Sequence, residues 1–266
     1  MNDDSPVRLE RRGTTALVTI DSPGTRNAFT PAVKDGIAAA IAQVNADRAL
    51  RAVVLTGAGG HFSAGGDVRG MARAERTGAE WLERMRDMNR FIRELILLDR
   101  PVIAAIDGAA YGGGFSVALA ADFVLATPRA RFCMPFMKIG LVPDCGATYT
   151  LPRAVGMSVA RQLMLSGREM LAAEALQLGI VAELHEPEQL LPRALAIADS
   201  FADASPLAVS LLKRNLIDAG ALDQLLDAEA NAQALAFNTA EHRDAVRRFV
   251  DKQQLAFQWP HLTNPT

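Results

Sequence analysis

Two glycine-rich segments, each placed after a short run of strand-forming residues, constrain this chain more than any other feature. The first is HFSAGGD at residues 61–67, which follows AVVLT at 52–56. The second is YGGG at residues 111–114, which follows VIAAI at 102–106 and precedes the helix-like FSVALA at 115–120. Glycine lets the backbone approach a ligand because it has no Cβ. N–H groups at the start of a helix also lack intrahelical acceptors. Together the two turns predict an oxyanion hole.

Each glycine segment taken alone is more typical of a tight turn. The glycines at 112–114 are not followed by the Lys-Ser/Thr of a phosphate-binding loop. They also lack the spacing of a dinucleotide-binding fingerprint. Because both segments follow successive predicted strands, we interpret them together as a pair of N–H donors.

Composition limits the classes of partner. Half of the 266 residues are apolar and the net charge is −2, so nucleic acid is not expected as the main partner. The acidic start MNDD is unlike a signal peptide, and the longest apolar stretches are too short to span a bilayer. We therefore expect a cytoplasmic protein without a membrane partner. Cys133, Cys145 and the four histidines show no metal-ligand spacing, so neither a disulfide scaffold nor a metal site is expected.

Alternating strand and helix patterns predict an α/β fold with crossover connections. A hairpin is expected within residues 7–21, and Thr30-Pro31 is a strong helix start. Apolar residues at 81, 85, 88, 92 and 95 have the spacing of one helix face. Residues 68–80 are expected to form a mobile segment near the first glycine turn. Another strand is expected at 123–126, and beyond about Gly156 the pattern is nearly all helical.

Asp144 is the strongest candidate for acid–base chemistry. It lies in GLVPDCG at 140–146, shortly after Phe132, Met134 and Phe136. Apolar surroundings disfavour a charged carboxylate, so its pKa should rise towards the range useful for a base. The alternative is an aspartate that caps a helix beginning near Gly146.

Four other residues have weaker claims. Asp67 is expected to be an N-cap, and His61 either an exposed loop residue or an acid–base group. Cys145 has no base nearby in the sequence. Ser116 lacks the spacing of a nucleophile elbow.

Several motifs in order resemble the crotonase (enoyl-CoA hydratase/isomerase) superfamily. They are SPGTRNA at 22–28, FSAGGD at 62–67, PVIAAIDG at 101–108 and GGG at 112–114. LPR at 151–153 and the predicted helix at 240–257 extend the resemblance over nearly the whole chain.

The resemblance implies a spiral of ββα units with the acyl-CoA site over residues 1–204. A C-terminal helical region, residues 205–266, would mediate a homotrimer or a dimer of trimers. The substrate would be an acyl-CoA thioester, so coenzyme A would be part of the substrate and no separate cofactor is expected. The thioester oxygen would accept hydrogen bonds from Gly66 and Gly113. The remaining expected contacts are Arg26, Ala28 and Ala64 along the coenzyme A, and Lys252 at the phosphates bound by a neighbouring subunit.

Departures from the family pattern bear on the reaction. Hydratases of the superfamily use two glutamates, and the matching positions here are Ser116 and Phe136, which are expected only to line the substrate site. Asp144 stands where isomerase branches carry an acidic residue, and residues 132–146 are similar to the phenylacetate-pathway isomerase. These features favour an isomerase that shifts a C3–C4 double bond to C2–C3. The alternatives are a hydratase, a hydrolase or dehalogenase with Asp144 as nucleophile, and a non-catalytic coenzyme A-binding homologue.

Overall fold

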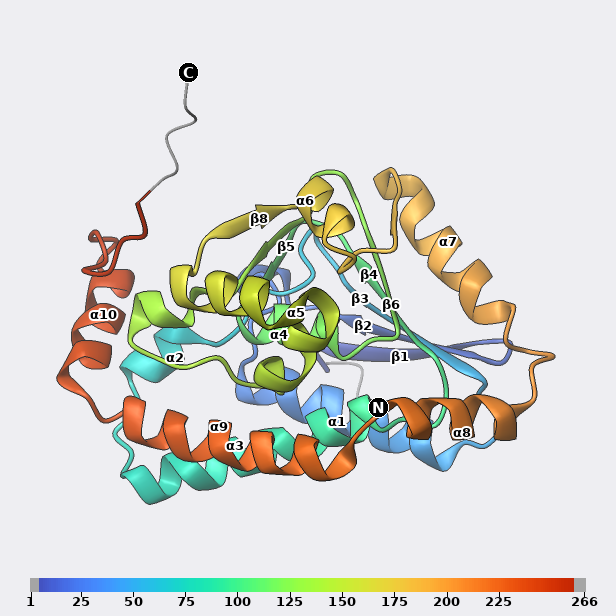
Figure 1. The fold of residues 1–266 in the computed structure, drawn as a ribbon, viewed down its shortest axis with the longest axis horizontal. Helices are drawn as coiled ribbons and strands as arrows, with labels where there is room; N and C mark the ends of the chain where they lie inside the picture. The colour runs from blue at the N-terminus through green and yellow to red at the C-terminus, as the bar shows by residue number, and fades with distance from the viewer. Residues whose placement is uncertain (1–4, 261–266) are drawn as a thin grey trace.

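The computed structural model describes residues 5–260 as an α/β fold with two sheets (Figure 1). The strands are β1 (Val7–Arg12), β2 (Thr15–Ile20), β3 (Ala52–Gly57), β4 (Val102–Ile106), β5 (Ala109–Tyr111), β6 (Phe123–Ala126), β7 (Arg131–Cys133), β8 (Glu169–Leu171) and β9 (Glu183–Leu184). The helices are α1 (Pro31–Ala46), α2 (Val68–Ala72), α3 (Gly78–Ile96), α4 (Gly113–Leu119), α5 (Ala147–Ser166), α6 (Ala172–Gln177), α7 (Pro187–Asp199), α8 (Pro206–Leu216), α9 (Ala219–Ala236) and α10 (Ala240–Val250). Two short 3₁₀ helices are η1 (Pro23–Thr25) and η2 (Pro135–Ile139).

The larger sheet has the order β1-β2-β3-β4-β6-β9, and the smaller sheet has the order β5-β7-β8. In the larger sheet only β1 is antiparallel to its neighbour. Both faces of the larger sheet are covered. Helix α7 packs on one face, against Val54 and Ile103, while the other face joins the main core with α1 and α3. Because both faces are covered, every residue of β2 and β4 is buried, and neither strand alternates between apolar and exposed polar residues.

Successive chain segments repeat the pattern of a large-sheet strand, a small-sheet strand and a helix. The segment β4-β5-α4 follows this pattern, and β6-β7 leads to η2 and α5 in the same way. Earlier turns use single bridges in place of the second strand: Phe29 pairs with Gly66, and Ser63 pairs with Ala110. The chain is therefore a spiral of ββα units, as expected from the resemblance.

Local signals placed most of the early elements correctly. The hairpin of β1 and β2 is confirmed, and the Thr30 side chain accepts from Val33 N–H at the start of α1. Helix α3 begins with a capping box between Thr77 and Glu80. Three features differ from expectation. Residues 68–80 contain α2, the second glycine segment follows β5 rather than β4, and the short strands β8 and β9 interrupt the helical C-terminal half.

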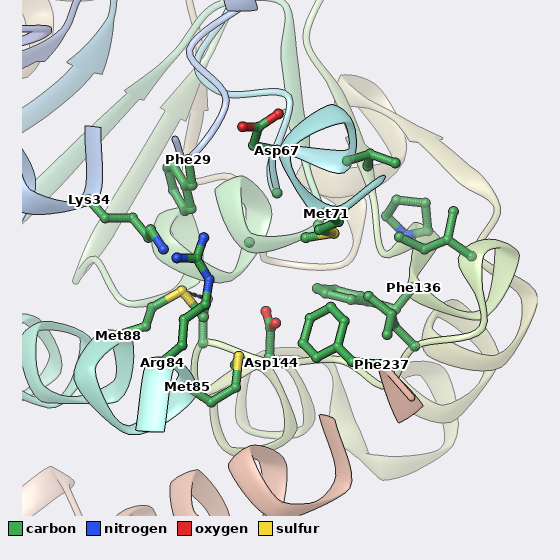
Figure 2. Close-up of a pocket in the computed structure, with 18 of the residues that line it drawn as sticks. Phe29, Lys34, Asp67, Met71, Arg84, Met85, Met88, Phe136, Asp144 and Phe237 are labelled. Atoms are coloured by element: carbon green, nitrogen blue, oxygen red, sulfur yellow. Dashed lines mark hydrogen bonds between the residues drawn. The ribbon is translucent and has the colours of Figure 1, made fainter. Parts of the chain in front are cut away.

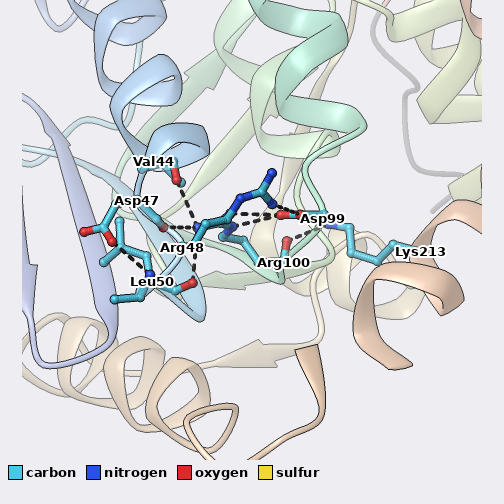
Figure 3. A network of polar contacts seen from close by, with 8 residues as sticks. Val44, Asp47, Arg48, Leu50, Asp99, Arg100 and Lys213 are labelled. Carbon is cyan, nitrogen blue, oxygen red and sulfur yellow. Dashed lines mark hydrogen bonds and ion pairs between the residues drawn. The ribbon is translucent and has the colours of Figure 1, made fainter. Parts of the chain in front are cut away.

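The C-terminal helices pack against the core. Helix α9 lies alongside α3, and α10 contacts α2 and η2 (Figure 1). Helix α8 is tied down through Lys213, whose Nζ donates to the carbonyl of Arg100 at 3.0 Å and pairs with Asp122. The buried guanidinium of Arg100 donates in turn to three carbonyls at the end of α1 and in the turn after it (Figure 3).

No helix within residues 5–260 is both long and apolar enough to cross a membrane.

Candidate active site

The two glycine segments meet in space. Gly65 has φ +84°, and a Cβ there would lie 2.3 Å from the carbonyl oxygen of Tyr111. Gly114 is packed so closely that a Cβ would lie 2.7 Å from the Cβ of Ser63. Only glycine permits these approaches. The tertiary structure thus brings the two predicted turns into direct contact.

Gly66 and Gly113 both line one cavity at this junction. Gly113 is the first residue of α4, so its N–H has no intrahelical acceptor. Among the hydrogen bonds of residues 5–260, neither N–H donates to a protein acceptor. The arrangement supplies two free donors beside one cavity, as an oxyanion hole requires.

The cavity is mostly apolar and receives residues from five helices (Figure 2). Phe136 from η2 and Phe237 after α9 lie on one side, together with Met71. Lys34 and Arg84 lie on the opposite side, and Asp144 points in from below in this view. Such a mixture of apolar walls and few polar groups is typical of small-molecule sites.

Asp144 is only 8% exposed and lines this cavity. Burial raises the pKa of its carboxyl group above the ordinary value, although a hydrogen bond from Gln233 lowers that pKa. Nε2 of Gln233 donates to Oδ2 of Asp144 at 2.7 Å, and Oε1 of Gln233 accepts from Val142 N–H at 3.3 Å. The Gln233 amide is therefore fixed in one orientation and holds the carboxylate in place.

Asp144 does not cap α5, so the alternative role considered for it is wrong. The cap is Glu229 of α9, whose carboxylate accepts from the N–H groups of Gly146 at 2.8 Å and Thr148 at 2.9 Å. Burial raises the pKa of Glu229 to about 7. A buried carboxylate at a helix N-terminus satisfies N–H groups that the helix itself leaves unpaired.

The other predicted site residues are dispersed. Ala64 and Phe136 line the cavity, and Ala64 N–H donates to the carbonyl of Arg26 at 2.9 Å. Ala28 is buried next to Phe29, whereas the Arg26 side chain is exposed. Ser116 is buried, donates to the Gly112 carbonyl and does not line the cavity.

The structure also places Lys252 and the three weaker candidates Asp67, Cys145 and His61. Lys252 is exposed just after α10 and does not line the cavity. Asp67 is the N-cap of α2 and accepts from Gly70 N–H, as expected. The Cys145 thiol lines the cavity, but burial raises its pKa well above the ordinary value, which disfavours a thiolate nucleophile. His61 is half-buried and does not line the cavity.

Sequence reasoning missed Gln233, Glu229, Lys34 and Arg84. Glu229 and Gln233 share one face of α9 with the buried Leu222, Leu226 and Ala230. Glu229 and Gln233 could have been found from the sequence as polar residues on an otherwise apolar helix face. The expectation that the site lies within residues 1–204 is therefore incomplete, because α9 supplies Gln233.

Known proteins resemble the chain over most of its length. Residues 10–260 match the sequence profile of the family described as Enoyl-CoA hydratase/isomerase. The chain is 35% identical over 253 residues to the short-chain-enoyl-CoA hydratase of Clostridium acetobutylicum, covering 94% of this chain and 96% of that protein. It is 34% identical over 245 residues to the 1,2-epoxyphenylacetyl-CoA isomerase of Escherichia coli, covering 90% and 93%.

A solved structure has the same fold. The enoyl-CoA hydratase from Bacillus halodurans superposes with a TM-score of 0.86 at 27% identity, covering 91% of this chain and 99% of that chain.

Proposed function

The chain belongs to the enoyl-CoA hydratase/isomerase family, and from this premise we propose that it is an enoyl-CoA isomerase that moves a C3–C4 double bond to C2–C3. Asp144 takes the proton from C2, and the electron pair of that C–H bond passes into a dienolate. Protonated Asp144 then donates the proton to C4, which leaves the double bond between C2 and C3. The reaction needs no further reactant, because the proton removed at C2 is the one added at C4.

The oxyanion hole supports the first step. As the C2 proton leaves, negative charge develops on the thioester oxygen, and the N–H groups of Gly66 and Gly113 are free to donate to it. Loss of one such donor typically raises a barrier by about 3–4 kcal/mol. The raised pKa of Asp144 supports its role as the acid–base group. A carboxyl group that both accepts and returns a proton works best when its pKa lies near the operating pH.

The single observation that carries the proposal is the isolation of Asp144 among the acidic groups of the cavity. Asp67, the other carboxylate that lines it, is occupied as the cap of α2. The family resemblance places Ser116 and Phe136 at the positions of the hydratase glutamates, and neither residue can serve as a base at neutral pH. Phe136 and Phe237 line one side of the cavity with aromatic rings, which hold no water for a hydration step.

Hydration is the main competing function, because one similar relative is named a hydratase. The test is an assay of 3-hexenoyl-CoA, crotonyl-CoA and ring-derived enoyl-CoA thioesters with the wild type and Asp144→Asn together. Isomerisation of 3-hexenoyl-CoA far faster than hydration of crotonyl-CoA is expected. Comparable rates would favour a hydratase instead.

Two further measurements address the remaining alternatives. A nucleophilic Asp144 would acquire ¹⁸O from labelled water during a single turnover, which the isomerase mechanism does not predict. Tight binding of every thioester without turnover would identify a non-catalytic homologue.

We also propose that residues 205–266 mediate a homotrimer or a dimer of trimers, with Lys252 near the coenzyme A phosphates of a neighbouring subunit. Support comes from exposed leucines along α8, a feature unusual on a monomer surface; they are Leu207, Leu211, Leu212 and Leu216. Light scattering coupled to gel filtration measures the mass in solution, and a monomer would contradict this assignment.

A further inference from the structure

Two cations line the cavity on the side opposite Phe136 and Phe237. Lys34 extends from α1 and Arg84 extends from α3, and both side chains point into the cavity (Figure 2). Both residues are half-buried. The mechanism proposed above gives neither of them a part.

Neither cation has a carboxylate partner among residues 5–260. Three other arginines of α3 do form ion pairs with aspartates, and these are Arg86, Arg90 and Arg93. The charges that act on Lys34 and Arg84 are those of Asp35, Asp67, Arg76, Asp144 and the Cys145 thiol. Asp67 and Asp144 are already engaged by Gly70 N–H and Gln233. Trp81 offers Arg84 a ring face 6.0 Å away but no negative charge.

The closeness of the two positive charges is energetically unfavourable when no anion is bound between them. Burial, and then the charge of Arg84, lower the pKa of Lys34 to about 8. Burial and neighbouring Arg76 lower the pKa of Arg84 as well. Partly buried like charges cost free energy unless an anion neutralises them. A cavity built only for a hydrocarbon chain needs neither group, and most of its other lining residues are apolar.

We propose that the acyl group accepted here carries a carboxylate at the end remote from the thioester, bound jointly by Lys34 and Arg84. A guanidinium donates two parallel hydrogen bonds to a carboxylate, and an ammonium adds a compact charge beside it. This inference rests on the proposed acyl-CoA site but not on the direction of the reaction.

The coenzyme A phosphates are a less suitable occupant. Lys34 and Arg84 line the same cavity as Asp144 and the two glycine donors. Arg26 and Ala28, which the family resemblance assigns to coenzyme A, do not line that cavity. Ala64, the third residue that the resemblance assigns to coenzyme A, does line the cavity, so free coenzyme A is one of the probes in the test below.

The test is calorimetric binding of three probes to the full chain. Adipoyl-CoA ends in a carboxylate, 6-methylheptanoyl-CoA is its uncharged isostere, and free coenzyme A lacks an acyl group. All three are saturated or unacylated and cannot isomerise, so the result is independent of the proposed reaction. The variants are Lys34→Met, Arg84→Met and the charge-retaining Arg84→Lys. Arg76→Met is the matched control, because exposed Arg76 lies near both cations but does not line the cavity.

The wild type should bind adipoyl-CoA at least about tenfold more tightly than its isostere, as expected for charge-assisted hydrogen bonds. Lys34→Met and Arg84→Met should each remove most of that preference. Arg84→Lys should retain part of it, because the charge stays but the paired hydrogen bonds are lost, and Arg76→Met should retain all of it. Equal wild-type affinities for the two thioesters would overturn the proposal. So would an equal loss of affinity for free coenzyme A in the Met variants, which would place the cations at the phosphates.

Discussion

Nε2 of Gln233 donates to Oδ2 of Asp144 at 2.7 Å, which joins α9 to the loop before α5. The two residues are 89 positions apart in the chain. Burial raises the pKa of Asp144, while this bond lowers it by stabilising the ionised form. Two opposing effects, which arise from different parts of the fold, therefore determine the pKa of Asp144.

Asp144→Asn should reduce the turnover of 3-hexenoyl-CoA by at least about a hundredfold, the usual contribution of a general acid–base group. The Asn oxygen can still accept from Gln233, so the local structure should persist. Steady-state kinetics give the turnover, and calorimetry with coenzyme A thioesters should show nearly unchanged affinity. Undiminished turnover would remove Asp144 from the mechanism.

Gln233→Leu should move the acid limb of the kcat/KM profile to higher pH. Asp144 acts as a base only when ionised, so kcat/KM rises as pH increases through its pKa. Loss of the Gln233 hydrogen bond raises that pKa further. Measurement across pH 5 to 9 should show recovery of activity at the alkaline end.

Asn89→Leu is the control for Gln233→Leu. Nδ2 of the buried Asn89 also donates to α9, at the carbonyl of Leu226, but Asn89 forms no bond with Asp144. Its variant should lose stability without a shift of the acid limb. An identical shift in both variants would assign the effect to packing of α9 rather than to the bond.

Gly65→Ala should damage both stability and activity more than Gly179→Ala. Both glycines have positive φ, and an alanine in that conformation costs about 1–2 kcal/mol. Only at Gly65 would the new Cβ also meet a backbone oxygen, that of Tyr111, at 2.3 Å; at Gly179 nothing lies within 4 Å. Urea unfolding and turnover should be measured together, and equal destabilisation would show that the close approach is dispensable.

Glu229 should make the protein less stable as pH rises towards 8. Its folded-state pKa of about 7 exceeds the ordinary value of 4.5, so the protonated form is favoured by folding. The stabilisation is complete below pH 4.5 and is lost as pH rises through 7, with a total of about 3 kcal/mol.

Both proteins in this comparison carry Asp144→Asn, because Asp144 also titrates with a raised pKa. One keeps Glu229 and the other carries Glu229→Gln, so the difference between them isolates the contribution of Glu229. Urea unfolding at pH 5 and pH 8 gives the two free energies of unfolding. The Gln variant should show the smaller decrease. Parallel decreases in the two proteins would mean that Glu229 does not titrate in this range.

Short-range signals predicted the elements best. Thr30-Pro31 identifies the start of α1 because capping involves residues three apart in the chain. The strands β8 and β9 were not predicted, since strands of three and two residues carry too little pattern. Helix α2 was missed for the same reason, although its cap Asp67 was recognised.

The sequence by itself determined the two glycine turns, the strands β3 and β4 and the apolar surroundings of Asp144, because each depends on neighbouring residues. Only the tertiary structure decided that Gly66 and Gly113 border one cavity. It also decided that Gln233 holds Asp144, and that Lys34 and Arg84 line one cavity with no ion-pair partner within residues 5–260. These relationships depend on how helices far apart in the chain pack against the sheets, and no local periodicity encodes which polar side chains that packing brings into contact.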